Sequence, residues 1–561
     1  MIEKKPSKNQ FLTFIKNNVF LLIAFLVCTF LVFYNLGKIE FWGEDEAQTL
    51  LYASRFLIGL KNQSLSNVTA LYNNATFSSV MLVQVPFILL FGVTELASRM
   101  PSAIITVLTL FVIYKIGRLL LNNRAVNFLV LAYAVSGAVG LFKSSIGVGF
   151  YIFFILLGFY YFERLLYPKE NKKNTSFRDL QLGMIFIVMA LISVPDAYFF
   201  VPFFFILILV NIKKIGIKRL VLSLIAPVSL LVGFIYFEFF LPRRLTGFNN
   251  ATYDHFLGRQ GGLEISFNFK EFFFGYINNF SIFFVIIFIL SLLTIIALVA
   301  IKKIKFPGIM IRVILLFFIH FIIWMFLTKS ENGHLTNSYP VALLIMAFAY
   351  QSVEGLLARN KNIYRDKKVS IKKWLFGIVL VLFICGNFYH TFILYNELSI
   401  NKEKYPCFYT PGKVPAGYVY GHKVGIKSAA YLLRQDEFFT GGLVSHYGSA
   451  FNFIYMGGEI IVYNSSNAIE YMMVGENITE KYKIRYIGIS LDFQNKDYLN
   501  YIDSQGFKKI VIVHEGQEIY YVYDVLTMSD ENIFIGRDEF DRAYNKEYSD
   551  YNIALPYFNS F

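Results

Sequence analysis

The sequence predicts a polytopic α-helical membrane protein with a soluble α/β domain at its C-terminal end. The first observation is composition: 56% of the 561 residues are hydrophobic and only 16% are charged, which is too apolar for a water-soluble globule. The second is that apolar stretches near the ~20-residue length of a spanning helix recur through residues 1–395. The third is that residues 396–561 lose these stretches and alternate short β-type and helical segments.

About eleven apolar stretches are long enough to cross a bilayer. They lie at 18–37, 101–120, 125–142, 150–167, 180–197, 198–212, 218–240, 277–301, 309–327, 339–357 and 373–395. Every second connection between them is rich in Lys and Arg, which accumulate in cytoplasmic loops. We therefore expect a cytoplasmic N-terminus. The net charge of +14 reflects this orientation, and we expect no nucleic-acid partner.

The pattern of basic loops holds only if one further apolar segment, residues 77–93, does not cross the membrane. We expect this segment to lie as a helix in the outer interface. An odd number of spans then exports the C-terminus. The chain would divide into a transmembrane domain, 1–395, whose first outer loop is 38–100, and an extracytoplasmic α/β domain, 396–561. The first span has no small-residue cleavage site, so we expect it to be retained.

Alternating apolar residues predict the strands of the C-terminal domain. The strand segments are "GGLVSHY", "GEIIVYN", "IRYIGIS" and "KKIVIVHEGQEIYYVYDV", and helices are expected at 421–434 and 494–505. The domain has no Gly-rich phosphate loop, so we assign it no nucleotide. The three cysteines, Cys28, Cys385 and Cys407, are too scattered for a disulfide framework or a thiolate metal site.

Acidic residues stand at the outer end of the first span, in "EFWGEDEAQTLLYASRFL", residues 40–57. Lipid on one side partly desolvates a carboxylate at this depth, which raises its pKa and suits a general base or a metal ligand. The alternative is that Asp45 and Glu46 cap the amphipathic helix that follows, because acids are favoured at a helix N-terminus. Position alone favours the capping role.

A second sequence block favours the catalytic role over the capping role. The segment "FGVTELASRMPSAIITVLTLFVIYKIGRLLLNNRA", residues 91–125, resembles a motif of the bacterial protein O-mannosyltransferase and lipid A aminoarabinose transferase superfamily. The matching residues are Phe91, Gly92, Thr94, Glu95, Arg99, Pro101, Ser102, Ala103, Gly117 and Arg118. In that family an Asp-Glu pair followed by Ala opens the first outer loop, which Asp45, Glu46 and Ala47 resemble. The two signals occur in the family's order and spacing.

The resemblance implies a GT-C fold and a glycosyltransferase that takes its sugar from a polyprenyl-phosphate donor on the extracytoplasmic side. The acceptor would be lipid A or another glycolipid, a glycan or a protein, and membrane lipids would surround the helices. A phosphate leaving group needs no protonation, so the site needs a base and cations rather than an acid. The resemblance implies that Asp45 is the base, or holds the acceptor or a divalent metal ion, and that Glu46 fixes its position.

Cations in other outer loops are candidates for binding the donor phosphate, because Arg forks match phosphate oxygens. The candidate substrate-binding residues are Lys143, Arg243, Arg244, His255, Arg259, His334 and Tyr339. Two family features have no counterpart: the acid of the loop "LFKSSIGVGFY" and a phosphate-binding Lys in "LYNNATFSSVML". Asp196 is the candidate for the missing acid.

Other functions remain open at this stage. A transporter or flippase would have a similar number of spans but would place ionisable residues within them, and a glycan polymerase or ligase of the cell envelope would share the fold. A non-catalytic receptor would leave the Asp-Glu pair unexplained. The Lys, Asn, Ile and Phe bias of the sequence is typical of an AT-rich bacterial gene and indicates a bacterial inner membrane.

Overall fold

The computed structural model describes most of the helical region and part of the C-terminal region. The described residues are 8–34, 36–37, 44–65, 68, 78–142, 146–166, 176–246, 281–304, 307–326, 338–359, 367–396, 442–445, 465–482, 484–490, 495–514 and 517–536. Two compact units emerge from the contacts along the chain. The first takes its residues from 1–34, 102–249 and 253–396, and the second from 35–101, 250–252 and 397–561. The predicted domain boundary near residue 395 stays a prediction.

The first unit is helical. Its elements are α1 (Lys8–Phe33), the greater part of α6 (Glu95–Leu120), α7 (Asn123–Ala134), α8 (Gly137–Phe142), α9 (Ile146–Leu166), α10 (Ser176–Leu191), η2 (Pro195–Phe200), α11 (Val201–Val210), α12 (Ile212–Ile215), α13 (Ile217–Ile235), η3 (Tyr236–Phe240), α14 (Leu241–Thr246), α17 (Ile282–Ala300), α18 (Gly308–Phe326), α19 (Tyr339–Arg359) and α20 (Lys367–Asn396). Each predicted apolar stretch coincides with one of these helices or with a broken pair of them.

Five of the described helical segments are long and apolar enough to cross a membrane. They are Glu95–Leu120, Gly149–Leu166, Ile217–Leu245, Ile282–Ala300 and Tyr339–Leu356. Shorter apolar helices such as Asn18–Phe33 and Gly377–Phe392 lie beside them. The protein is therefore a multi-pass membrane protein, while the predicted total of about eleven spans stays a prediction.

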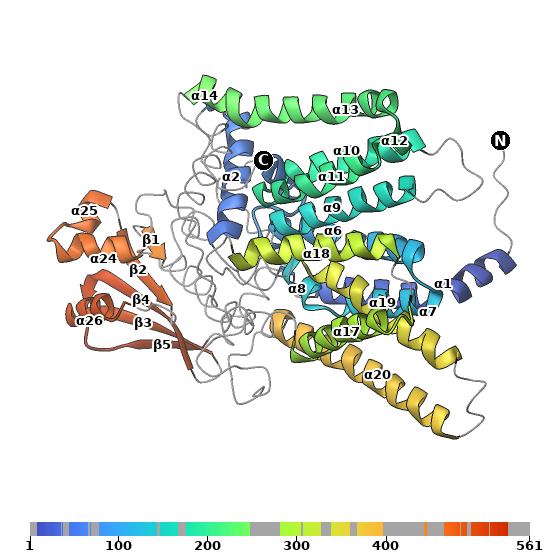
Figure 1. The fold of residues 1–561 in the computed structure, drawn as a ribbon. Helices are drawn as coiled ribbons and strands as arrows, with labels where there is room; N and C mark the ends of the chain where they lie inside the picture. Colours follow the sequence, from blue (N-terminus) through green and yellow to red (C-terminus); the bar gives the residue numbers. More distant parts are fainter. Residues whose placement is uncertain are drawn as a thin grey trace. The chain divides into compact units, whose positions relative to one another are not determined.

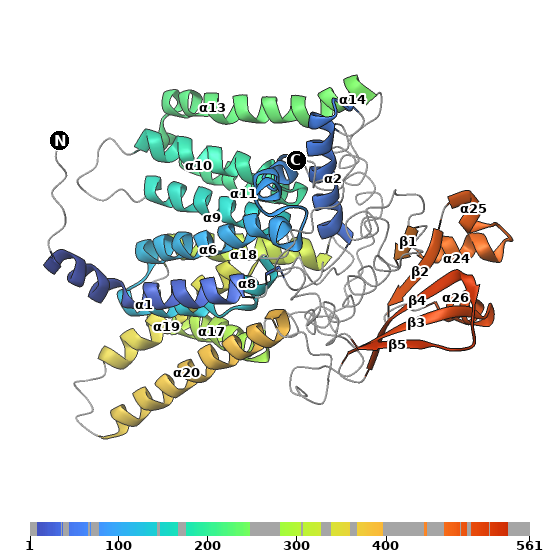
Figure 2. The ribbon, with the colours of Figure 1, turned by 180° about the vertical axis from the view of Figure 1, so that it is seen from behind.

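The helices of the first unit pack as a bundle. In Figures 1 and 2, α13, α10 and α9 lie side by side with roughly parallel axes, and α10 contacts both of the others. Glycines allow the close approach of α9 and α10, because a Cβ on Gly158 would lie 3.3 Å from the carbonyl oxygen of Gly183. Small residues at such crossings are typical of helix packing in membranes, where tight van der Waals contact replaces the hydrophobic effect.

The predicted span 125–142 is broken in its middle. α7 ends at Ala134 and α8 begins at Gly137, so the carbonyl group of Val135 loses its place in the helical ladder. The hydroxyl group of Thr391 on α20 donates a hydrogen bond to this carbonyl oxygen over 2.8 Å. A side chain from a distant helix thus satisfies a backbone group that lipid could not, as a membrane interior requires.

The second unit contains three helices from the predicted first outer loop, residues 38–100, which we call the first outer segment: α2 (Glu44–Lys61), α4 (Ser78–Leu82) and α5 (Val85–Phe91). A turn at Val83 and Gln84 separates α4 from α5, so the predicted interfacial helix at 77–93 is interrupted and forms two short helices. The apolar stretch Val80–Phe91 is too short to cross ~30 Å of hydrocarbon at 1.5 Å per residue. Its exposed leucines, Leu89 and Leu90, fit an interfacial position.

The C-terminal region of the second unit holds a five-stranded mixed sheet in the order β1-β2-β4-β3-β5. The strands are β1 (Gly442–Ser445), β2 (Ile484–Ser490), β3 (Phe507–His514), β4 (Gln517–Met528) and β5 (Ile533–Gly536), and the helices are α24 (Ser465–Met473), α25 (Ile478–Tyr482) and α26 (Lys496–Ser504). The predicted strand segments "GGLVSHY", "IRYIGIS" and "KKIVIVHEGQEIYYVYDV" and the helix at 494–505 are therefore confirmed, the last of these strand segments as the antiparallel pair β3 and β4. The segments 421–434 and 458–464 lie outside the described residues.

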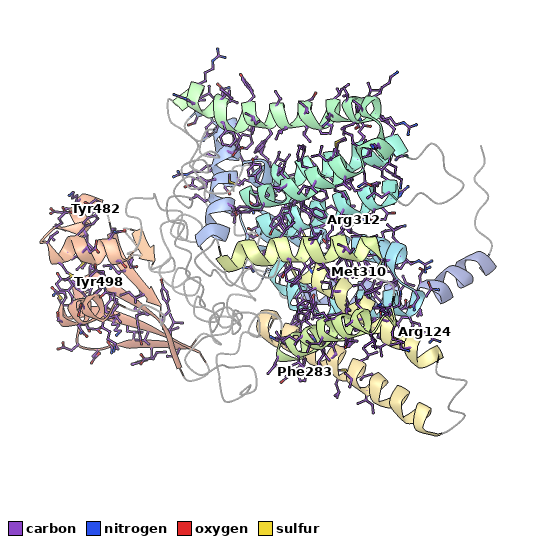
Figure 3. The ribbon with its side chains drawn as sticks, in the orientation of Figure 1. Arg124, Phe283, Met310, Arg312, Tyr482 and Tyr498 are labelled. Carbon is purple, nitrogen blue, oxygen red and sulfur yellow. The ribbon has the colours of Figure 1, made fainter. Side chains whose placement is uncertain are left out.

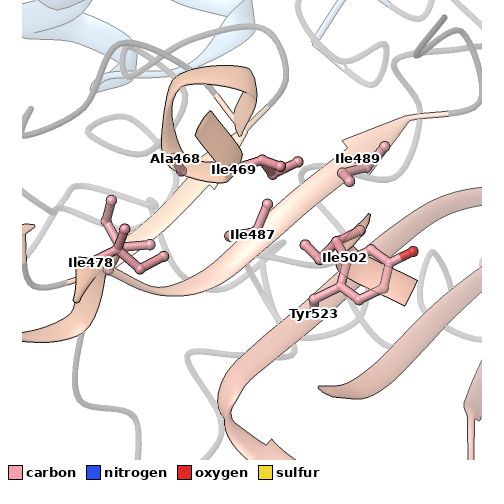
Figure 4. Packing of buried hydrophobic residues seen from close by; sticks show 8 residues of the cluster. Ala468, Ile469, Ile478, Ile487, Ile489, Ile502 and Tyr523 are labelled. Carbon is pink, nitrogen blue, oxygen red and sulfur yellow. The ribbon is translucent and has the colours of Figure 1, made fainter. Parts of the chain in front are cut away.

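A compact apolar core holds this sheet against its helices. Figure 4 shows Ile487 and Ile489 of β2 with Ala468 and Ile469 of α24 and Ile502 of α26, all of them fully buried. Ile487 and Ile489 are two residues apart, so they lie on one face of the strand. This alternation is the pattern that predicted the strand, and burial of that face against the helices explains why it formed.

Candidate active site

The candidate base lies in the first turn of α2. Glu44 begins this helix and Asp45 and Glu46 follow it directly, although the side chains of the two candidate residues lie outside the described part of the chain. Acids at this position interact favourably with the positive end of the helix dipole. The backbone therefore agrees with the capping role and with a catalytic role equally.

The body of α2 is fixed by packing. Ala47, Leu50, Ala53 and Leu57 are all buried, and α2 contacts both α4 and α5. The spacing of three and four residues places this set over one broad side of the helix. An amphipathic helix held in this way gives its first turn, and the acids on it, a defined position.

A buried amide forms a polar contact between three elements of the first outer segment. Gln84, at the turn between α4 and α5, is completely buried. Its Nε2 donates to the carbonyl oxygen of Ser98 over 3.2 Å and lies 3.1 Å from the Ser98 Oγ and 3.5 Å from the Thr49 Oγ1. Thr49 belongs to α2 and Ser98 to α6. Gln84 therefore connects the turn between α4 and α5 with the acid-bearing helix α2 and with the start of α6.

The motif at residues 91–103 builds the corner before α6. Gly92 ends α5 with a φ of 70°, a left-handed conformation that glycine adopts without the strain of a Cβ. Two residues later, the Thr94 hydroxyl group accepts a hydrogen bond from the backbone N–H of Ala97 over 3.2 Å. This is an N-terminal cap on α6. These motif residues have a local structural role.

Arg99 of the same motif is also buried, with 3% of its surface exposed. Its Nη1 donates to the carbonyl oxygen of Leu36, just beyond α1, over 3.0 Å. The bond connects the end of α1 with α6 across 63 residues of sequence. Ser102 and Ala103, which complete the motif, are fully buried as well. The described motif residues of 92–103 therefore support the structure of the first outer segment.

The predicted phosphate ligands are described only in part. Arg243 and Arg244 lie on α14 and are exposed, so both guanidinium groups are accessible to a ligand. Lys143, His255, Arg259 and His334 lie outside the described residues, as does the side chain of Asp196 in η2. Their predicted roles stay predictions.

Tyr339, the last predicted site residue, begins α19 and is fully buried. Its ring stacks on that of Phe284 in α17, with centroids 4.1 Å apart and planes inclined by 19°. Offset stacking of this kind stabilises a helix pair. The contact places Tyr339 in the packing between α17 and α19, and its predicted substrate-binding role stays a prediction.

A buried ion pair in the first unit was not predicted from the sequence. Arg312 of α18, labelled in Figure 3, forms a bidentate pair with Glu163 of α9, with Nε–Oε1 and Nη2–Oε2 distances of 2.5 and 2.6 Å. Glu163 is 1% exposed at its side chain and Arg312 18%. The only signal in the sequence is one charge of each sign within two apolar runs 149 residues apart.

Basic residues of the predicted cytoplasmic loops have structural partners. Arg124 pairs with Glu354 of α19, and the backbone N–H of Asn122 donates to the Gln351 Oε1 over 2.6 Å. In Figure 1, the start of α7, which bears Arg124, lies at the same end of the first unit as α12 with Lys213 and Lys214. These two predicted cytoplasmic connections thus lie at one end of the bundle.

The part of the chain that the structure describes contains no group of three or more His, Cys, Asp or Glu side chains that could hold a metal ion. The described residues therefore do not form a metal site by themselves. Asp45 remains the candidate ligand, and no part of the function proposed below depends on a metal.

Comparison with solved structures reveals proteins of similar fold. The chain superposes on ArnT from Cupriavidus metallidurans, a lipid A aminoarabinose transferase, with a TM-score of 0.54 and 13% identity, covering 91% of this chain and 98% of that one. An oligosaccharyltransferase from Archaeoglobus fulgidus gives a TM-score of 0.54 and 11% identity, covering 93% of this chain and 75% of the transferase. No protein-family model and no curated protein matches the sequence.

The chain has the GT-C fold of these membrane glycosyltransferases, which confirms the resemblance seen in the sequence at the level of the fold. Nearly the whole of ArnT is covered, so the match includes both the helical region and the region after it. At 11–13% identity the likeness defines the fold, and function must be argued from the site.

Proposed function

We propose that the protein is an integral-membrane glycosyltransferase that moves a sugar from a polyprenyl-phosphate carrier to an acceptor on the extracytoplasmic face of a bacterial inner membrane. One observation carries the proposal: the fold is shared with ArnT over nearly the full length of both chains, and one structure of ArnT is bound to undecaprenyl phosphate. The archaeal transferase AglB has likewise been solved with a dolichol-phosphate and an inhibitory peptide.

The chemistry needs a base and an anion-binding site. In our proposal the Asp45 carboxylate takes the proton from a hydroxyl or amino group of the acceptor as that group attacks the anomeric carbon of the sugar. The bond between this carbon and the phosphate oxygen breaks, and the polyprenyl phosphate leaves with the electron pair. The leaving phosphate is a stable anion, so no acid has to protonate it.

Cations would hold the phosphate as its charge develops. Arg243 and Arg244 fit this role because they are exposed neighbours on one short helix, α14. Each guanidinium group can donate two parallel hydrogen bonds to the oxygens of one phosphate. We assign the same role to Arg259, His255, His334 and Lys143 on their positions in the predicted outer loops. Glu46 would orient Asp45.

The packing of the helical bundle argues against the transporter alternative. A transporter places ionisable residues within its spans, where they face a path. Among the described buried charges, Glu163 pairs with Arg312 and Asp179 pairs with Arg164, which favours a packing role for these groups over cargo binding. The hydroxyl or amine acceptor could belong to a glycolipid, a growing glycan or a protein, and the chemistry is the same in each case.

The decisive experiment combines purified protein with envelope analysis. Protein in lipid nanodiscs is incubated with a series of synthetic polyprenyl-phosphate sugars, and release of free polyprenyl phosphate is followed by mass spectrometry. In parallel, envelope glycolipids and glycoproteins are profiled in a deletion strain and in strains carrying Asp45→Asn or Arg259→Ala. We expect the same glycan to disappear in all three. An unchanged profile in the deletion strain, with a transport defect instead, would overturn the proposal.

A further inference from the structure

The amide of Gln84 is a buried polar group in the described part of the first outer segment. It is fully buried, and it lies in the otherwise apolar run "VMLVQVPFILLF" of α4 and α5. The backbone alone does not require a polar side chain here, because Gln84 makes no side-chain cap on α5. A buried polar side chain is retained only where its hydrogen bonds offset the loss of water, so its contacts should reveal its role.

The orientation of the amide is fixed by one of these contacts. The carbonyl oxygen of Ser98 can only accept a hydrogen bond, so the atom 3.2 Å from it must be the Nε2 donor. The Ser98 Oγ at 3.1 Å and the Thr49 Oγ1 at 3.5 Å surround the same nitrogen. The other end of the amide, Oε1, is buried and has no hydrogen-bond partner in the described structure. Gln84 thus has all its contacts on the side of α2 and α6.

Thr49 lies four residues after Asp45 on α2. Residues four apart lie on the same side of an α-helix, one turn above the other. Asp45 therefore lies one turn before Thr49 along the side of α2 that Gln84 contacts. A shift of this amide would rotate or translate the first turn of α2 more directly than it would affect the far end of the helix.

We propose that Gln84 is a positioning residue for sugar transfer: its amide joins Thr49 of α2 to Ser98 of α6 and so fixes the place of Asp45. The inference rests on the proposed function of Asp45. Catalytic groups have to be held within about 0.5 Å of their productive geometry, and a displacement of about 1 Å can cost roughly 100-fold in rate. One buried amide between three elements can supply that precision.

The test replaces the amide by a side chain of similar length without polar atoms, Gln84→Met. We expect kcat per folded molecule to fall roughly 10- to 100-fold while the KM for the donor stays within about twofold, because the donor phosphate is bound by other residues. Thr49→Val should show the same pattern more weakly. Thr49→Ser, which keeps the hydroxyl group, should retain the kcat of the wild type. Normal kcat per folded molecule in both Gln84→Met and Thr49→Val would overturn the inference.

Ser54→Ala is the matched control. Ser54 is buried on the same helix, but its hydroxyl group donates only to the Leu50 carbonyl oxygen of α2 itself, over 2.6 Å. This variant should keep kcat within about twofold of wild type, since the bond does not reach α4, α5 or α6.

A second readout does not depend on enzyme activity. Hydrogen exchange of α2 amides, followed by mass spectrometry, should be faster for residues 44–50 in Gln84→Met and in Thr49→Val, and unchanged for residues 53–61. Unchanged exchange in both variants would refute the positioning role even if no sugar transfer were found. Absence of transfer by the wild-type protein, with the expected exchange pattern, would instead refute the function proposed above. If Gln84→Met did not fold, Thr49→Val would decide both measurements.

Discussion

Two blocks of the first outer segment, residues 44–46 and residues 92–103, differ in how they use their polar groups. The second block directs them inward: Thr94 caps α6, Ser98 contacts Gln84, and Arg99 holds the carbonyl oxygen of Leu36. The first block places three consecutive carboxylates at the start of α2, where the helix that follows is fixed by packing. Residues 92–103 thus form framework contacts, whereas the three acids of residues 44–46 are the block to which the proposed function assigns the chemistry.

The largest effect should come from the acidic block. Asp45→Asn should reduce kcat for sugar transfer roughly 1,000-fold or more, since general base catalysis contributes about 10²–10⁴, and Glu46→Gln should cost about tenfold. The melting temperature should stay close to that of the wild type, because a carboxylate at the wet interface contributes little packing. Transfer by Asp45→Asn at near-wild-type rates would return these acids to a capping role.

The buried ion pair of the bundle should affect stability instead of chemistry. Glu163→Gln leaves the guanidinium group of Arg312 without its charged partner, and breaking a buried pair from one side costs about 3–5 kcal/mol. We expect that loss in equilibrium unfolding in detergent micelles, with kcat of the folded fraction unchanged. Replacing both residues by Met should recover part of it. A loss of kcat equal to that of Asp45→Asn would extend the active region into the bundle.

A smaller loss of stability is expected from the framework block. Arg99→Met removes the charged hydrogen bond to Leu36, which is worth about 1.5–3 kcal/mol. The free energy of unfolding should fall by this amount, while the folded protein should keep most of its activity. Arg178→Met is a suitable control, because Arg178 is exposed and should leave unfolding unchanged. Equal destabilisation by both variants would show that the Arg99 contact contributes nothing specific.

The smallest effect is expected at the basic end of the bundle. The Arg124 side chain is 77% exposed in its pair with Glu354, and exposed ion pairs contribute little because water screens them. Arg124→Gln should leave both the melting temperature and kcat unchanged within error. A clear loss of membrane insertion would instead assign Arg124 a role in orienting the chain.

The parts of the fold that follow local rules could be predicted from the sequence. Apolar length marked the helices, and alternation in "IRYIGIS" marked β2, because both signals are repeated within a few neighbouring residues. The same rule missed the break at Val135, since the residue that stabilises it, Thr391, lies 256 residues away. The pairing of Glu163 with Arg312 was hidden for the same reason.

Only the candidate site residues that match a family motif could be predicted from the sequence. The acids of α2 were found because they stand out against an apolar background and match a family pattern. Gln84 was missed because a single amide in an apolar run has no partner that the sequence can reveal, and its contacts to Thr49 and Ser98 arise only when α2, α5 and α6 pack together. Framework residues such as Arg99 carried the resemblance, and the proposed function assigns them no part in the chemistry.

The most direct test of this division compares Asp45→Asn with Arg99→Met in one assay. Both proteins are loaded with the same polyprenyl-phosphate sugar in nanodiscs, and single-turnover transfer is measured per folded molecule. We predict that Asp45→Asn folds normally and transfers at least about 100-fold more slowly than Arg99→Met, which is less stable but active. Equal rates, or the reverse order, would contradict the assignment of catalysis to the first block and support to the second.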